Sequence, residues 1–181
     1  MPSSDEAATM EIVECIEKRI SVRSFGEGEV PDEVVMEALR LAQLAPSAGN
    51  LQARDFVIVR DSETKAMLAK AAFGQMFLED AAVVIVVCAN LNRIRNYGSR
   101  GSELYCLQDV AAATEHIMLY VCSKGFGSCW VGAFDEAEVC KALQLPGHAR
   151  PLVMIPIGKP KEEGRRTPRL KLDTLTHIEK W

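Results

Sequence analysis

The stretch K-R-I-S-V-R-S-F at residues 18–25 concentrates three cations and two hydroxyl groups. Arg19, Ser21 and Arg23 occupy every second position, and side chains two residues apart point to the same side of an extended segment. Two guanidinium groups and a hydroxyl on one side can engage the oxygens of a phosphate monoester in pairs. The stretch therefore predicts an extended segment that carries a phosphate-binding site.

Phosphate contacts alone would hold a small ligand only weakly. Charge-assisted hydrogen bonds contribute about 1.5–3 kcal/mol each, so three of them give about 4–9 kcal/mol. Micromolar affinity requires about 8 kcal/mol. We therefore expect a second, apolar part of the ligand to be buried. The alternative interpretation of the stretch is a solvated basic turn that follows a helix.

The composition is that of an ordinary globular protein, which makes the basic stretch a local feature. The chain has 181 residues, of which 48% are hydrophobic and 25% charged, and its net charge is −4. We expect one domain over residues 1–181, because a chain of this length buries roughly 70% of its unfolded surface. The negative charge argues against nucleic-acid binding. No apolar run reaches the roughly 20 residues of a membrane helix, and the polar, acidic first residues differ from a signal peptide.

The cysteines and histidines indicate neither disulfides nor a structural metal. The six cysteines are spread singly, mostly in apolar segments, and no CxxC motif occurs. The three histidines lie far apart in the sequence. This usage predicts reduced, packed cysteines in a cytoplasmic protein without a metal site.

Helical periodicity surrounds the basic stretch on both sides. Apolar residues at spacings of three and four predict a helix over 5–18 and a second helix over 31–45. Pro31 and the acids that follow it fit a first helical turn. Pro46 ends the second helix.

Residues 46–52, P-S-A-G-N-L-Q, are small and polar and follow this helix directly. Such a glycine-containing loop can bring its backbone close to a ligand. The amides of Asn50 and Gln52 can both donate and accept hydrogen bonds, which suits the edge of a heterocycle. The alternative is a simple connecting turn.

The middle of the chain predicts a sheet. Residues 55–60 read as a short apolar strand, and residues 62–72 as a helix. Residues 81–89 form a nearly continuous β-branched run, which is typical of a central strand buried on both faces. Residues 90–101 contain Asn, Arg and Gly around Tyr97 and predict a mobile loop with solvated arginines.

The second half begins with the longest expected helix, over 102–124, which is apolar on most sides and could be central or pack against a partner chain. Residues 125–134, G-F-G-S-C-W-V-G-A-F, suggest another close backbone approach to a ligand. They lack the third glycine of a dinucleotide fingerprint. Asp135 predicts the start of a helix, and residues 152–157 predict a strand before a basic tail.

Four stretches together resemble the FMN-dependent nitroreductase family. They are R-I-S-V-R-S-F at 19–25, A-P-S-A-G-N-L-Q at 45–52, G-F-G-S-C-W-V-G-A-F-D at 125–135 and I-G-K-P at 157–160. Their order and spacing also match, and the resemblance covers nearly the whole chain. It implies an α+β fold with a mostly antiparallel central sheet flanked by helices. It also implies an intertwined homodimer with two FMN sites at the subunit interface.

The resemblance further implies which residues hold the phosphate end of FMN. Arg19, Ser21 and Arg23 would bind the phosphate and ribityl chain, as their chemistry indicates independently. A basic residue of the tail would join them. Arg169 fits this role best, and Arg166 is the second candidate.

The remaining implied contacts lie at the flavin ring, and no catalytic side chain is required. In the family a backbone N–H at the position of Gly132 points at flavin N5, where hydride arrives and leaves. Residues 46–48 would line the flavin from the partner subunit, and Asn50 would reach the flavin or ribityl region. The full set of these candidates is Pro46, Ser47, Ala48, Asn50, Gln75, Trp130, Val131, Gly132 and Ala133.

The sequence departs from the family pattern in three places. Ala53 and Arg54 stand where the family often has Pro-Trp, which leaves the geometry of the preceding loop open. Residues 74–77, G-Q-M-F, lack the lysine or asparagine that some members place near the ring, and only Gln75 remains. The chain is also short, so any segment covering the substrate must be reduced, with residues 90–101 as the remaining cover.

The resemblance implies an oxidoreductase that works by alternating half-reactions. NADH or NADPH would reduce FMN, and a nitroaromatic, quinone or similar small acceptor would then take two electrons from it. One alternative is a specialised member of the family, such as a dehalogenase or an enoyl-type reductase. Another is a flavin-binding, electron-handling protein that a partner protein reduces.

Overall fold

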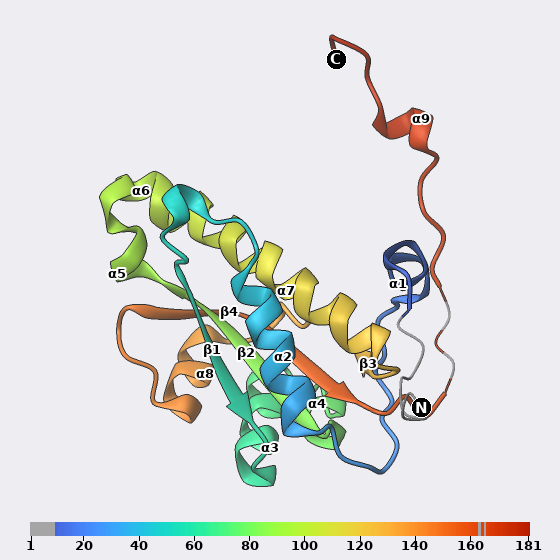
Figure 1. The fold of residues 1–181 in the computed structure, drawn as a ribbon. Coiled ribbons are helices and arrows are strands. Elements are labelled where there is room, and N and C mark those ends of the chain that lie inside the picture. The colour runs from blue at the N-terminus through green and yellow to red at the C-terminus, as the bar shows by residue number, and fades with distance from the viewer. Residues whose placement is uncertain (1–9, 163, 165) are drawn as a thin grey trace, which may run out of the picture.

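The structure, a computed structural model, describes residues 10–162, 164 and 166–181. Four strands form one antiparallel sheet in the order β1-β2-β4-β3. These strands are β1 (Arg54–Val59), β2 (Val83–Asn90), β3 (Gly127–Ser128) and β4 (Ala149–Gly158). Helices cover the sheet on both faces (Figure 1). The predicted α+β fold with a mostly antiparallel sheet is confirmed.

Strand β2 lies in the interior of the sheet, and all eight of its residues are buried. Alternate residues of a strand point to opposite faces. Accordingly Val83, Ile85 and Val87 pack into one hydrophobic cluster, while Val84 and Val86 pack into the other. The continuous β-branched run therefore serves both cores, as the sequence predicted.

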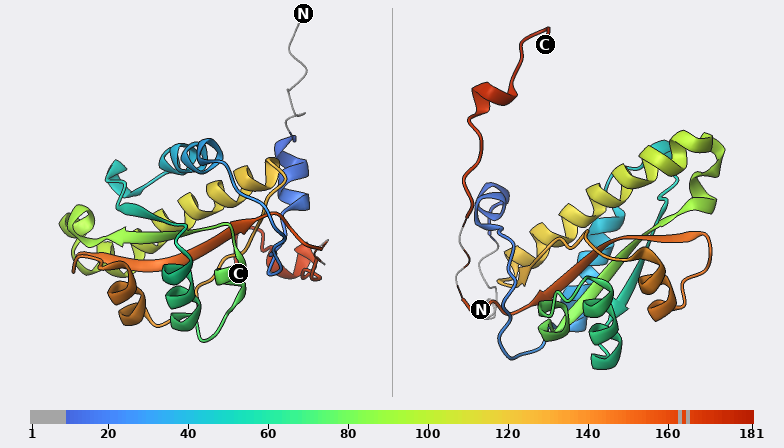
Figure 2. Two further views of the ribbon diagram at one scale, coloured as in Figure 1. Left: turned by 90° about the horizontal axis from the view of Figure 1, so that it is seen from below. Right: turned by 180° about the vertical axis from the view of Figure 1, so that it is seen from behind.

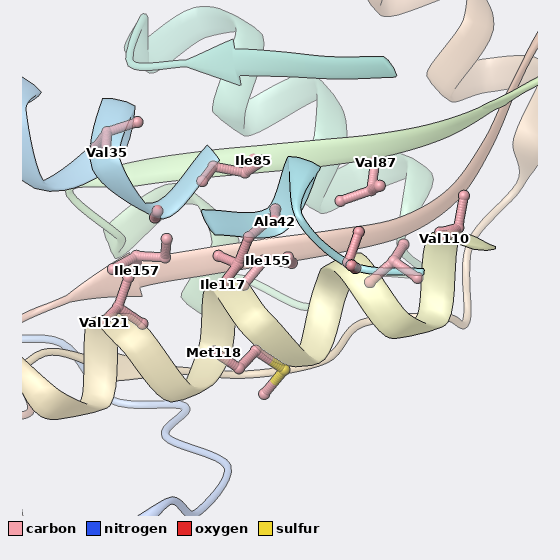
Figure 3. Packing of buried hydrophobic residues seen from close by; sticks show 14 of the residues in the cluster. Val35, Ala42, Ile85, Val87, Val110, Ile117, Met118, Val121, Ile155 and Ile157 are labelled. Atoms are coloured by element: carbon pink, nitrogen blue, oxygen red, sulfur yellow. The ribbon is translucent and has the colours of Figure 1, made fainter. Parts of the chain in front are cut away.

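The first face of the sheet is covered by α2 (Asp32–Gln43) and α7 (Cys106–Ser123). Figure 3 shows Ile117 and Val121 of α7 and Ala42 of α2 pointing toward Ile85 and Ile155 of the sheet. The predicted long helix is confirmed, although its first turn is a π-helix, η3 (Gly101–Tyr105). The second face carries α3 (Ser62–Ala71), α4 (Phe77–Asp80) and α8 (Glu136–Leu143) (Figure 2).

Two peripheral segments lie beside the C-terminal end of α7. Helix α1 (Ile12–Lys18) buries Cys15 against this end, where the Cys15 thiol lies 3.4 Å from the Leu119 carbonyl oxygen. The predicted start of this helix at residue 5 lies outside the described residues. The tail passes α1 and runs away from the body with the short helix α9 (Leu172–Leu175) (Figures 1 and 2).

Residues 90–101 are the clearest difference from the sequence prediction. They form three short helical turns instead of a loop: α5 (Leu91–Ile94), η2 (Arg95–Tyr97) and α6 (Gly98–Arg100). The Asn90 side chain accepts a hydrogen bond from the Arg93 N–H, which caps α5, and Ile94 is fully buried. Arg93 is also not simply solvated, because it ion-pairs with Asp55 at 2.7 Å.

Within the described residues, no helix is both long and apolar enough to cross a membrane. Across the same residues, no group of three or more His, Cys, Asp or Glu side chains could hold a metal ion.

Candidate functional site

A small basic hollow lies where the N-terminal segment meets the tail. Arg19, Ser21 and Arg23 line it from one side and Arg166 and Arg169 from the other, around a volume of about 160 Å³. The structure thus brings together all five residues that were expected near a phosphate. The hollow is far too small for a whole nucleotide, and its size suits one phosphate-sized group.

The segment through Ser21 is extended because it pairs with the sheet. The Val22 N–H donates to the Ser128 carbonyl oxygen at 2.9 Å, and Ser21 forms a parallel bridge with Ser128. Val22 and Phe25 are buried, while Arg23 faces solvent. This alternation explains why the residues at every second position share the hollow.

The hollow holds more positive charge than its neighbours neutralise. Arg19 Nε lies 3.4 Å from Glu115 Oε1 on α7. Arg166 donates instead to the Ile16 carbonyl oxygen, and Arg169 donates to the carbonyl and hydroxyl oxygens of Thr167. Among the described residues, no carboxylate forms an ion pair with Arg23, Arg166 or Arg169. The surplus favours a dianionic ligand.

The second candidate region, residues 46–50, lies at the other end of α7. It contains the 3₁₀ turn η1 (Ala48–Asn50), which sits near the N-terminal end of α7, whereas the basic hollow lies near its C-terminal end (Figures 1 and 2). The 18 residues of α7 span roughly 27 Å at 1.5 Å per residue. A single chain therefore does not bring Pro46, Ser47, Ala48 and Asn50 to the basic hollow.

Two residues to which the sequence analysis assigned no role, Asp109 and Arg54, hold this loop. The Ala48 N–H donates to Asp109 Oδ1 at 2.9 Å. Arg54 is only 4% exposed and donates to the carbonyl oxygens of Gln43 and Ala45 at 2.8 and 2.7 Å. Burial lowers the pKa of Arg54, and the nearby Asp109 charge opposes that shift. The departure at residues 53–54 was the one sequence signal for this arrangement.

Arg54 also provides hydrogen-bond donors for the backbone carbonyl groups at the C-terminal end of α2. A helix leaves its last carbonyl groups without intrahelical partners. Arg54 Nη1 additionally lies 3.3 Å from the Pro46 oxygen and 3.4 Å from the Asp109 backbone oxygen. One buried guanidinium therefore connects the end of α2, the loop and the start of α7.

The third candidate region is the segment after β3. Val131 is buried and exchanges two hydrogen bonds with Met154, each 2.9 Å long, whereas Trp130 and Gly132 face outward. In the described part of the chain, no group accepts a hydrogen bond from the Gly132 N–H. Gln75 Nε2 donates to the Ala133 carbonyl oxygen at 3.1 Å, which places Gln75 beside this segment.

Cys129 precedes these residues and is buried. Burial raises the pKa of its thiol, so that the unreactive protonated form is favoured. This environment fits the expected packing role.

The comparisons with known proteins identify the family. A sequence model described as the nitroreductase family matches residues 16–80 and 73–159. A "Putative NADH dehydrogenase/NAD(P)H nitroreductase" of Archaeoglobus fulgidus is 35% identical over 179 residues, covering 94% of this chain and 99% of that protein. The chain belongs to the nitroreductase family.

Two further relatives of this chain have names that mention FMN. The "FMN reductase (NADPH)" of Bacillus subtilis is 27% identical, over 91% of this chain and 72% of its own length. The solved structure "NADPH:FMN oxidoreductase from Vibrio harveyi complexed with NAD+" superimposes with a TM-score of 0.87 and 25% identity. That alignment covers 94% of this chain and 77% of the Vibrio chain.

The loop at residues 46–50 places one glycine, Gly49, in the left-handed region of the backbone. Gly49 has φ +57°, and a Cβ built there would lie 2.5 Å from the Tyr97 hydroxyl oxygen. We expect Gly49→Ala to lower the free energy of unfolding by about 1–2 kcal/mol, because alanine is strained in the left-handed region and Tyr97 must move. Urea unfolding followed by circular dichroism measures the change.

Gly147→Ala is the matched control for this prediction. No atom lies within 4 Å of a Cβ at Gly147, so we expect a change below about 0.5 kcal/mol there. Equal stabilities of the two variants would contradict the tight contact between Gly49 and Tyr97.

Proposed function

We propose that this oxidoreductase is an FMN-dependent NAD(P)H oxidoreductase that reduces small acceptors. The observation that carries the proposal is the basic hollow, in which guanidinium groups from both ends of the chain surround a phosphate-sized volume. The printed names of the Bacillus and Vibrio relatives support FMN and a nicotinamide reductant. The described residues share one sheet with a core on each face, which supports a single FMN-binding domain over residues 1–181.

The residues present fit the cofactor. Arg19, Ser21 and Arg23 would bind the phosphate, with Arg169 and Arg166 completing the shell from the tail. Their surplus charge offsets the two negative charges of a phosphate monoester. When bound, FMN would take a hydride from NADH or NADPH and deliver two electrons to a nitroaromatic, quinone or similar acceptor.

The protein groups beside the flavin ring would position the cofactor and would not take part in the reaction themselves. The N–H of Gly132, from which no described group accepts a hydrogen bond, would act as the donor, and the Val131–Met154 pairing would hold the backbone beside it. Gln75 holds the Ala133 carbonyl and so fixes the other side of the same segment. Trp130 faces outward on this segment, where its indole would exclude water from the ring. No acid or base side chain is needed for this role.

A homodimer would unite the separated parts of the site. Residues 46–50 and the basic hollow lie at opposite ends of α7, so a second copy is needed for both to contact one flavin. The tail supports association because it leaves large apolar side chains exposed: Leu170, Leu172, Leu175, Ile178 and Trp181. Sedimentation velocity at micromolar concentration should give the mass of two chains. A monomer that still binds FMN would contradict a shared site.

The decisive test of the cycle is spectroscopic. The purified protein, loaded with FMN, should lose its flavin absorption when NADPH or NADH is added without oxygen. It should regain the absorption when a quinone or nitroaromatic follows. A flavin that stays oxidised with both nucleotides would overturn the proposed reductant and would favour reduction by a partner protein.

We also propose a cytoplasmic location. All six cysteines are free thiols, and most of them are buried. This usage supports a reducing compartment. Quantitative alkylation of the denatured protein isolated from cells, without prior reduction, would test for disulfides.

A further inference from the structure

Residues 91–105 form a helical projection at the N-terminal end of α7. Three short turns and the π-helix η3 follow one another without an extended stretch. Ile94 and Gly101 are buried at its base, and a Cβ at Gly101 would lie 2.6 Å from the Ile94 carbonyl oxygen. The first turn of η3 is therefore packed closely against α5.

The projection is packed directly on the loop at residues 46–50. The Tyr97 hydroxyl oxygen lies so near Gly49 that a Cβ there would be 2.5 Å from it. Arg93 donates to the carbonyl oxygens of Gln52 and Arg54 at 3.1 and 2.8 Å. The projection therefore stands beside the loop that the proposed function assigns to the flavin.

Two aromatic rings and a cation meet on this projection. The rings of Tyr97 and Tyr105 are perpendicular, with their centres 5.2 Å apart. Arg100 Nε donates to the Tyr105 hydroxyl at 2.8 Å, and the guanidinium carbon lies 5.3 Å from the centre of the same ring. Tyr97 is 42% exposed, which leaves much of its surface open to a ligand.

The charge of the projection is not neutralised within the described residues. Neither Arg95 nor Arg100 forms an ion pair with a described carboxylate, although the chain as a whole carries a net charge of −4. Arg100 is instead oriented by a neutral phenol, which leaves its remaining donors for another acceptor.

We propose that Tyr97, Tyr105 and Arg100 form a subsite for a ligand in which an anionic group is attached to a flat aromatic ring, either directly or through a sugar. The exposed tyrosine surface would contact the ring, and Arg100 would pair with the anion. Tyr105 acts as a positioning residue for Arg100. The inference rests on the proposed function, because that function places the loop at residues 46–50 against the flavin.

Two ligands of this class could occupy the subsite. One is an aromatic acceptor that carries a carboxylate, and the other is the adenosine part of NADPH, whose ribose carries the 2′-phosphate. Matched probes separate them: 4-nitrobenzoate against 4-nitrobenzamide, and 2′,5′-ADP against 5′-AMP. The dissociation constant of each probe is measured by calorimetric titration of the purified protein with oxidised FMN present.

We expect the anionic member of one pair to bind about fivefold to tenfold more tightly than its counterpart. Arg100→Gln should abolish this preference, and Tyr105→Phe should reduce it while keeping the ring. Lys141→Gln removes the same charge from an exposed position on α8 and should preserve the preference. The pair that shows the preference identifies the source of the anion.

Two results would overturn the subsite. One is equal affinity within both pairs in the unmodified protein, and the other is an unchanged preference in Arg100→Gln. A preference lost equally in Lys141→Gln would also count against it, because it would reflect net charge alone. Absence of turnover with either nucleotide would overturn the proposed function instead, while the binding ratios would still decide the subsite.

Discussion

Replacing Arg19 and Arg23 together by alanine is expected to weaken FMN binding about 100-fold or more. Each side chain lines the basic hollow, and each charge-assisted hydrogen bond to a phosphate is worth about 1.5–3 kcal/mol. Two of them correspond to about 3–6 kcal/mol, and every 1.4 kcal/mol is roughly tenfold in affinity. Quenching of FMN fluorescence on binding gives the dissociation constant directly.

The double substitution should lower the affinity for FMN without changing the fold or the stability of the protein. The backbone pairing of Val22 with Ser128 holds this segment, and it does not depend on the two arginine side chains. We therefore expect the double variant to keep its circular dichroism spectrum and its unfolding midpoint without FMN.

A matched double variant controls for net charge. Lys70→Ala with Lys141→Ala removes two exposed cations from α3 and α8 and should leave the dissociation constant within about twofold. Arg19→Lys with Arg23→Lys keeps the charge but loses the paired donors, so an intermediate loss is expected. A folded Arg19→Ala, Arg23→Ala protein that binds FMN as tightly as the unmodified one would show that the hollow is not the phosphate site.

Arg54→Met is expected to lower the free energy of unfolding by about 2–4 kcal/mol. Arg54 donates to four backbone oxygens, of which those of Gln43 and Ala45 lie at 2.8 and 2.7 Å. A buried carbonyl that loses its partner costs about 1–3 kcal/mol. Methionine removes the desolvated charge as well, which offsets part of that cost. Urea unfolding with an unchanged m-value would measure the difference.

Arg40→Met provides the comparison for this variant. Arg40 is exposed on α2 and pairs with Glu37 three residues earlier. Such surface pairs contribute about 0.2–1 kcal/mol. A loss at Arg54 no larger than the loss at Arg40 would mean that the carbonyl groups at the end of α2 are satisfied without it.

The sequence predicted correctly those features for which the spacing of residues along the chain shows which side chains share a face. The β-branched run at 81–89 corresponds to β2, which is buried on both faces. A strand with apolar residues at successive positions has no polar face to expose to solvent. The positions of Arg19, Ser21 and Arg23, two residues apart, likewise predicted correctly that their side chains lie on the same side of the segment. The meeting of these residues with Arg166 and Arg169 followed from the family resemblance, since no local pattern relates the two ends of the chain.

Other features depended on partners that a sequence does not reveal. Arg54 donates to four backbone carbonyl oxygens. Every residue has a backbone carbonyl group, so the sequence around Arg54 does not indicate which of them it binds. The turns at 91–100 were missed because Asn, Arg and Gly are typical of loops. Their order comes from the burial of Ile94 and the capping by Asn90. The position of residues 46–50 relative to the hollow depends on the length of α7.

The basic hollow joins parts of the chain that are made at very different times. Arg166 bonds the Ile16 carbonyl oxygen across 150 residues. Synthesis proceeds from the N-terminus at about 5–20 residues per second, so Arg19 and Arg23 are made well before Arg166 and Arg169. If the hollow binds the phosphate of FMN, as proposed, complete binding has to wait until Arg166 and Arg169 have been made. A chain terminated before residue 166 would retain the four described strands but would lack Arg166 and Arg169, and with them one side of the proposed phosphate site.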